Sequence, residues 1–306
     1  MERALSIAEE RVTGALGVYV AEVKAHQVTI EIGGMPILLR TDSPEFAEVL
    51  ENRYGGFVNP EAQPIFAFDV EIAPPGRVTY EKELRVSAAE GRWVIERGDF
   101  HAECDLASGK GRIRQPANLY SIEAALRILH SLLLALRGGL LVHAASAVRH
   151  GDAYLFAGVS GAGKTTITRL APPDATLLTD EISYLRREGS GYVAYGTPFA
   201  GELGEPGRNV RAPLAGLFLL EHGAENRVVP VEKAEAVRGL MRHVLFFARD
   251  ETLVKMVFQT VCDFVKNVPV RRLIFTPDQR VWELVRDDPA GARPRRPFGR
   301  PVRFDL

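Results

Sequence analysis

Several features that would indicate other classes of protein are scarce in these 306 residues. There are only two cysteines, Cys104 and Cys262, far apart and in no metal-ligand spacing, which argues against a disulfide scaffold or a zinc site and favours a reducing compartment. The chain also has no large excess of charge of either sign, because 38 Lys and Arg nearly balance 39 Asp and Glu, for a formal net charge of -1. Without a basic excess, nucleic acid is not expected as the main partner.

Long uninterrupted hydrophobic runs are also missing. The most apolar region, Leu126 to Val148, is broken by Arg127, His130, Arg137 and His143, so we expect it to be unable to span a bilayer. The first eleven residues are charged from the start and contain no apolar core of signal-peptide length. The chain is therefore predicted to be cytoplasmic, with no membrane segment.

What the chain does contain is one segment with the spacing of a phosphate-binding loop, Gly158-Val159-Ser160-Gly161-Ala162-Gly163-Lys164-Thr165. An apolar strand is expected before it, at 154–157, and a short helix after it, at 165–170. The glycines let main-chain N–H groups approach phosphate oxygens, and the positive helix N-terminus adds to the attraction. This context argues against a chance match and predicts a nucleotide site.

Each residue of this loop has an expected role in holding ATP and Mg²⁺. Lys164 is expected to reach the β- and γ-phosphates, and the Thr165 hydroxyl is expected to be a Mg²⁺ ligand. The residues expected to bind the nucleotide are Gly158, Ser160, Gly161, Ala162, Gly163, Lys164, Thr165 and Thr166.

A pair of acids, Asp180-Glu181, follows an apolar strand at 176–178 and lies sixteen positions past Lys164. Phosphoryl transfer needs a carboxylate to hold Mg²⁺ and one to take the proton of a hydroxyl acceptor. We assign Asp180 to the metal and the catalytic base role, and Glu181 to metal or acceptor positioning, with the two roles open to exchange. The alternative is a pair of solvated acids in a loop.

Other candidates for the site are weaker. His143 lies in a strand expected to pair with 154–157, where it is either a core residue or a partner of a carboxylate or phosphate. Glu202, in a turn-rich segment, is a possible third acid, and 208–211 carries arginines that suit phosphate. For both of these segments a surface loop is the favoured interpretation.

The pattern of apolar residues predicts an α/β fold in three parts. Residues 1–116 form a β-rich domain, with strands at 27–32, 36–40, 65–72, 83–87 and 92–96. Residues 117–286 form the nucleotide-binding, kinase-like domain, with a mixed, largely antiparallel sheet. It opens on a helix capped by Asn118 or Ser121, and the turn at 149–152 is too short to join parallel strands, so the strands on either side of it are antiparallel. Residues 287–306 form a Pro- and Arg-rich tail.

The order of His143, the loop from Gly158 to Thr165, and Asp180-Glu181 resembles the nucleotide domain of the HPr kinase/phosphorylase family, within the superfamily of phosphoenolpyruvate carboxykinase. The resemblance covers about residues 118 to 285. It implies an ATP- and Mg²⁺-dependent kinase for a seryl hydroxyl, with His143 near the acid pair. The family carries two aspartates where this chain has Asp180 and Glu181, so the chain looks like its divergent kinases, some of which are associated with ribosomally made peptides.

Three functions are compatible with these motifs. The first is a kinase for a hydroxyl of a peptide, protein or small molecule, with catalytic residues Asp180, Glu181, His143 and Lys164 and metal ligands Thr165, Asp180 and Glu181. The second is an ATPase or GTPase switch, which would turn over nucleotide without an acceptor. The third is a non-catalytic nucleotide-binding protein. For each of the three functions, a homo-oligomer is possible.

Overall fold

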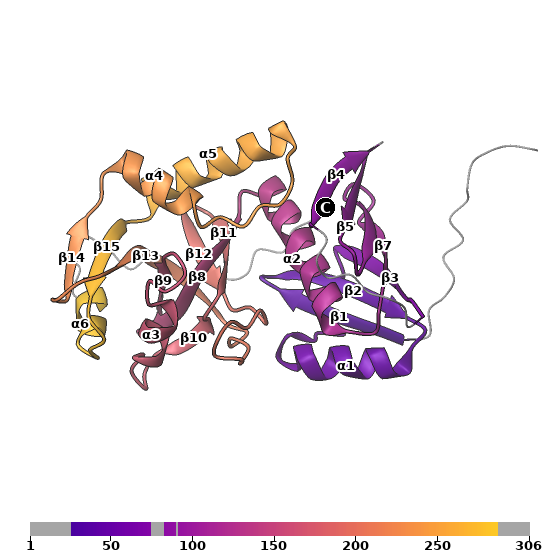
Figure 1. Ribbon diagram of the computed structural model, residues 1–306, viewed down its shortest axis with the longest axis horizontal. Coiled ribbons are helices and arrows are strands. Elements are labelled where there is room, and N and C mark those ends of the chain that lie inside the picture. Colours follow the sequence, from indigo (N-terminus) through magenta and orange to yellow (C-terminus); the bar gives the residue numbers. More distant parts are fainter. Residues whose placement is uncertain (1–25, 75–82, 90, 287–306) are drawn as a thin grey trace, which may run out of the picture.

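The computed structural model describes residues 26–74, 83–89 and 91–286. It is an α/β protein with two β-sheets, and the long helix α2 (Leu119–Leu136) stands between them (Figure 1). The mixed α/β class predicted from the sequence is thus confirmed. The expected tail at 287–306 and the charged N-terminus lie outside the described residues.

The first sheet lies within residues 26–115 and has the strand order β1-β2-β3-β7-β6-β5-β4. Its strands are β1 (His26–Ile32), β2 (Met35–Thr41), β3 (Phe66–Ile72), β4 (Arg85–Ala89), β5 (Arg92–Glu96), β6 (His101–Asp105) and β7 (Lys110–Gln115). Between β2 and β3 come α1 (Pro44–Tyr54) and the short 3-10 helix η1 (Gly55–Phe57), and α1 packs on β1 and β2.

The predicted strands of this half are confirmed, including the hairpin at Gly33-Gly34. Both glycines have positive φ, +62° and +67°, and β1 and β2 pair from Ile32 opposite Met35. The sequence reading missed α1, β6 and β7. A start signal for α1 was available, because the Ser43 hydroxyl caps the helix by accepting from the Phe46 N–H at 3.1 Å.

The second sheet lies within residues 140–275. Its strands are β8 (Leu140–Arg149), β9 (Asp152–Ala157), β10 (Thr176–Thr179), β11 (Ile182–Glu188), β12 (Gly191–Tyr195), β13 (Arg211–His222), β14 (Arg227–Pro230) and β15 (Val270–Phe275). The helices that accompany them are α3 (Lys164–Arg169), α4 (Lys233–Met241), α5 (Glu251–Asn267) and α6 (Val281–Arg286).

Strand pairing in this sheet explains why several segments meet at one edge. β8 and β9 are antiparallel neighbours, as the short turn between them predicted, whereas β13 runs parallel to both β9 and β15. The carboxyl ends of β9, β13 and β15 therefore lie together. Because β8 also pairs with β11, the sequence of neighbours β8-β11-β12-β13-β9 returns to β8.

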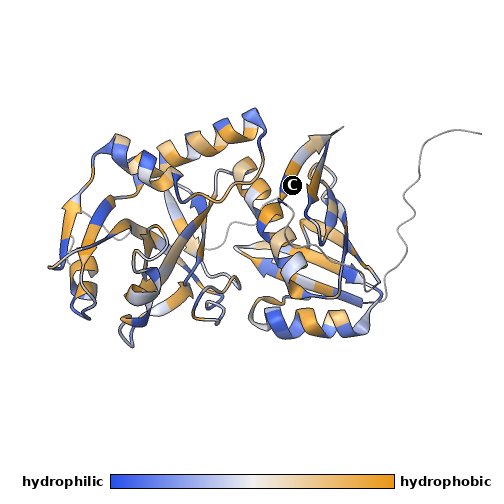
Figure 2. Ribbon diagram, viewed as in Figure 1, coloured by the Kyte–Doolittle hydropathy of each residue, from blue (hydrophilic) through white to orange (hydrophobic). Residues whose placement is uncertain are grey.

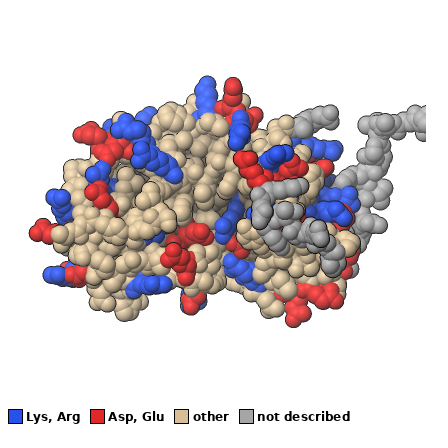
Figure 3. All heavy atoms as spheres, in the orientation of Figure 1, with Lys and Arg blue, Asp and Glu red and all other residues tan. Residues whose placement is uncertain are grey.

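Helix α2 is the central element of the core. Asn118 caps it as predicted, with its side-chain oxygen accepting from the Ser121 N–H at 3.0 Å. The helix is long and apolar enough to cross a membrane, and most of its residues are hydrophobic (Figure 2). Within the protein, however, 67% of it is buried. Lys, Arg, Asp and Glu are interspersed over the face drawn in Figure 3, in keeping with the balanced charge.

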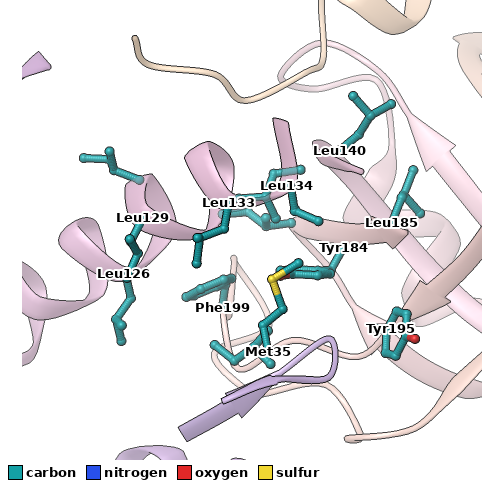
Figure 4. Close-up of a cluster of buried hydrophobic side chains, with 14 of the residues drawn as sticks. Met35, Leu126, Leu129, Leu133, Leu134, Leu140, Tyr184, Leu185, Tyr195 and Phe199 are labelled. Carbon is teal, nitrogen blue, oxygen red and sulfur yellow. The ribbon is translucent and has the colours of Figure 1, made fainter. Parts of the chain in front are cut away.

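The β1–β2 hairpin joins the first sheet to the second. Gly33 lies against the Tyr184 ring, so closely that a Cβ atom at this position would be 2.1 Å from a ring carbon. The Arg186 guanidinium donates to the Gly33 carbonyl at 2.8 Å, and Met35 packs beside Tyr184 beneath α2 (Figure 4). One hydrophobic core consequently extends over both sheets.

A buried histidine in α2 predicts a pH-dependent stability. His130 is fully buried, its Nδ1 lies 3.0 Å from the Tyr184 hydroxyl, and Nε2 has no hydrogen-bond partner among the described residues. Burial lowers the pKa of His130 from 6.5 to about 3. Below pH 6.5 the unfolded chain therefore binds a proton that the folded chain does not, and stability is lost as the pH falls toward 3.

As the pH falls from 6 to 4, we expect this imidazole alone to lower the free energy of unfolding by about 1.4 kcal/mol for each pH unit. Urea unfolding of the wild type and of His130→Gln across this range measures the effect. The variant should show a shallower dependence on pH, and equal slopes for the two proteins would contradict the prediction.

Candidate phosphate-binding site

The loop from Gly158 to Thr165 connects β9 to α3, the strand, loop and helix order that the sequence predicted. Gly161 and Gly163 have φ of +79° and +101°, a conformation that favours glycine. Gly163 also lies against Phe275 at the end of β15, where a Cβ atom would be 2.5 Å from the ring. Side chains at these two positions would distort the loop.

Among the other loop residues, Ala162 is buried and its N–H donates to the Val159 carbonyl at 3.0 Å, whereas Ser160 is exposed. Thr166 is half-buried in the first turn of α3, and its carbonyl accepts from the Leu170 N–H. Solvent therefore reaches the outer side of the loop at Ser160, while its inner side packs on the sheet.

Lys164 is the cation of the loop, and its ammonium group folds back on the loop backbone. Its Nζ donates to the carbonyls of Gly158 at 2.9 Å and Val159 at 3.4 Å. Partial burial lowers the pKa of Lys164, and the negative charges of Glu202 and Glu181 oppose that shift. The two acids that act on Lys164 electrostatically are thus Glu202 and Glu181.

Glu202 lies directly at the loop. Its Oε2 accepts a hydrogen bond from the Thr165 hydroxyl at 2.9 Å. The sequence interpretation favoured a plain surface loop for this acid, and no local signal distinguishes it, because its position depends on a contact thirty-seven residues away in the chain. The structure brings it to the hydroxyl that was expected to bind Mg²⁺.

Asp180 holds the loop that carries Glu202. It is buried, with 4% exposure, and its two oxygens accept the backbone N–H groups on either side of Glu202, from Gly201 at 2.8 Å and Leu203 at 2.9 Å. Gly201 is packed so tightly here that a Cβ atom would be 2.9 Å from both the Asp180 carboxylate and Glu181 Cβ. Both Asp180 oxygens are therefore used within the protein.

Glu181 lies in the bend between β10 and β11. Because successive side chains of a straight strand point to opposite faces, Asp180 and Glu181 could both face the site only at such a bend. The Thr179 hydroxyl oxygen accepts the N–H groups of Glu181 and Ile182, both at 3.1 Å, which shapes the bend. Burial raises the pKa of Glu181, and the nearby charges of Arg127 and Lys164 lower it in part. Glu181 is thus a half-buried carboxylate on the same side of the fold as Lys164.

His143 lies on β8, one residue before Ala144, which pairs with Ala157 at the base of the loop. Its opposite neighbour in the sheet is Ile182, directly after Glu181. Burial, and after it the charge of Lys164, lowers the pKa of His143 below its ordinary value, so the imidazole is neutral near pH 7.

Two further histidines at the site were not singled out from the sequence. The carbonyl of His243 accepts the N–H of His143 at 2.7 Å, and burial together with His143 and Lys164 lowers the pKa of His243 to about 4. His222, at the end of β13, places Nε2 2.7 Å from the Gly161 carbonyl at the tip of the loop. Neither has a sequence motif: His222 is brought here by β13, and His243 by the turn after α4, next to the bridge between Val142 and Val244.

The residues at this edge include oxygen donors of the kind that a hard cation prefers, Thr165, Glu202 and Glu181. Within residues 26–74, 83–89 and 91–286, no group of three or more His, Cys, Asp and Glu side chains is arranged to hold a metal by itself. Mg²⁺ usually takes only one or two carboxylates and receives its other ligands from phosphate and water, so this donor set suits a metal that arrives with a nucleotide.

Comparison with known families gives one match. A family model described as SynChlorMet cassette protein ScmC matches residues 104–287, a span that contains α2, the phosphate-binding loop, the acid pair and Glu202. No curated protein matches the chain.

Proposed function

Because the chain belongs to the family of SynChlorMet cassette protein ScmC, and the name of that family states no reaction, we propose its function from the site. The proposal is an ATP- and Mg²⁺-dependent kinase that transfers a phosphoryl group to a hydroxyl of a peptide, protein or small molecule. The observation that carries it is the meeting of the loop lysine, the Thr165 hydroxyl and two acids at one sheet edge.

The phosphate-binding part of the proposal rests on the loop itself. Main-chain N–H groups near Gly161 and Gly163 and the N-terminus of α3 favour a polyphosphate, and Lys164 exchanges its two carbonyl partners for phosphate oxygens. Bound Mg²⁺ would neutralise charge on the transferred phosphoryl group. Thr165 and Glu202 are the side chains of this chain that would hold it, which leaves the Glu181 carboxylate for the acceptor.

Acceptor activation is assigned to Glu181. Asp180 and Glu181 were given roles open to exchange, and the geometry favours that exchange, because both Asp180 oxygens accept backbone N–H groups. In the proposed step the acceptor oxygen forms a bond to the γ-phosphorus, the bond to the β–γ bridging oxygen breaks, and Glu181 takes the hydroxyl proton. Its raised pKa makes the Glu181 carboxylate a better base.

The HPr kinase-type fold remains part of the proposal. The β8–β9 hairpin that leads into the loop, the placement of His143 beside it and the acid pair after β10 support it. His143, neutral near pH 7, is proposed to hydrogen-bond a phosphate oxygen or a carboxylate of the site.

The test is transfer of label from γ-labelled ATP to seryl and threonyl peptides and to water at a series of Mg²⁺ concentrations. The wild type should label an acceptor, and Glu202→Gln should raise the half-saturating Mg²⁺ concentration about tenfold or more, because one ligand is weakened. Glu205→Gln, in the same loop and also exposed, is the matched control and should behave as the wild type. ATP turnover with no label in any acceptor would favour an ATPase instead, and no ATP binding would exclude the proposal.

A further inference from the structure

One guanidinium lies between the acids of the site and the first sheet. Arg127, on α2, places Nη2 3.6 Å from Glu181 Oε2 and donates to the Glu123 carboxylate one turn earlier in the same helix. Its guanidinium carbon lies 5.1 Å from the centroid of the Phe199 ring. Arg127 was considered in the sequence only as an interruption of an apolar run.

The position of Arg127 is fixed from several sides. Glu123 also accepts a hydrogen bond from the Arg53 guanidinium at 3.1 Å. Arg53 lies in α1, the helix that packs on the first sheet. The side chains of Arg127 and Glu123 are only 26% and 17% exposed, so this is a shielded chain of charges rather than a surface pair. Shielded pairs are less weakened by solvent and salt than exposed ones.

Phe199 connects Arg127 to the second acid of the site. Its ring is fully buried, and its carbonyl accepts from the Thr179 hydroxyl at 3.3 Å. Three residues later in the same segment is Glu202, which bonds Thr165. The guanidinium thus contacts Glu181 directly and lies on the base of the loop that presents Glu202.

A half-buried carboxylate needs a fixed partner of opposite charge to stay oriented. Lys164 supplies part of that charge, but it is also the group expected to move onto phosphate. Arg127 does not belong to the phosphate-binding loop and is braced by Glu123 and Arg53. It can therefore hold Glu181 whether or not a nucleotide is present.

We propose that Arg127 is a positioning residue for phosphoryl transfer, which acts by holding the Glu181 carboxylate toward the phosphate-binding loop. The inference rests on the proposed function. Arg127 also connects Glu181, through Glu123 and Arg53, to the helix α1 that packs on the first sheet.

The test is a double-mutant cycle on phosphoryl transfer from γ-labelled Mg-ATP to the acceptor peptide or to water, with Arg127→Met, Glu181→Gln and the combined variant. Arg127→Met should lower kcat about 10- to 100-fold, as loss of a residue behind a catalytic group does, and should change the KM for ATP less than twofold. In the Glu181→Gln background the same change should cost little, because its partner is already neutral. Arg127→Lys should restore part of the lost rate.

Arg187→Met is the matched control. Arg187 pairs with Asp263 at 3.3 Å, on β11 and α5, and is expected to keep wild-type turnover. Losses from Arg127→Met and Glu181→Gln that multiply in the combined variant, or a loss from Arg187→Met equal to that from Arg127→Met, would overturn the inference and leave the proposed function standing. A wild type that neither binds Mg-ATP nor transfers its γ-phosphoryl group to any acceptor or to water would overturn both.

Discussion

Replacement of Lys164 by alanine is expected to lower Mg-ATP turnover about 100- to 1000-fold, the range measured when one preorganised donor to developing charge is removed. Lys164 is the cation of the phosphate-binding loop, and burial has already removed part of its water shell. A positive charge held in such a place interacts more strongly with phosphate than one in open solvent. Steady-state release of ADP measures the effect.

The fold should tolerate this substitution. Among the described residues, the ammonium group donates hydrogen bonds to the carbonyls of Gly158 and Val159, and the substitution leaves both carbonyls in place. We therefore expect the melting temperature of Lys164→Ala to lie close to that of the wild type. Lys266→Ala, at an exposed position of α5, is the control that should retain full turnover, and equal turnover of Lys164→Ala and the wild type would contradict the assignment of the loop.

Replacement of Asp180 by alanine is expected to lower both stability and turnover. The N–H groups of Gly201 and Leu203 would lose the carboxylate that accepts their hydrogen bonds at a buried position. This loss costs about 2 to 3 kcal/mol of unfolding free energy. The segment with Glu202 would also lose its anchor, and turnover should fall about 10- to 100-fold. Chemical denaturation and ADP release, measured on the same preparation, test both effects.

Two comparisons separate a structural from a chemical role. Glu202→Gln should change the free energy of unfolding by less than about 0.5 kcal/mol, because Glu202 is exposed, while it still impairs the Mg²⁺ response. Asp174→Asn, at an exposed carboxylate that pairs with the more buried Arg149, should leave turnover unchanged. An Asp180→Ala protein of unchanged stability would show that the two backbone contacts contribute little.

The strand, loop and helix around Gly158 to Thr165 could be predicted from the sequence because their geometry is local. Gly161, Gly163 and the flanking strand and helix lie within residues 152–169, and the positive φ angles of the two glycines shape the turn. The same holds for the hairpin at Gly33-Gly34 and for the cap of α2 at Asn118.

The roles of the acids could not be read in the same way. Whether Asp180 faces the loop or the backbone depends on how the segment after β12 folds over β10, a contact made by N–H groups that any residue carries. Glu202 and Arg127 reach the site across long stretches of chain, and neither has a spacing that marks it. Sequence periodicity describes which residues are buried, but not which polar side chains meet.

The insertion of the β1–β2 hairpin beside Tyr184 has a consequence for how the chain can be divided. Beside the Gly33 contact, the Tyr184 ring and the neighbouring side of α2 are covered by Met35 and its strand, so a fragment that began at α2 would turn that apolar surface to water. The first sheet therefore covers part of the hydrophobic core of the half that carries the loop from Gly158 to Thr165, and cutting the protein between its sheets would expose that core.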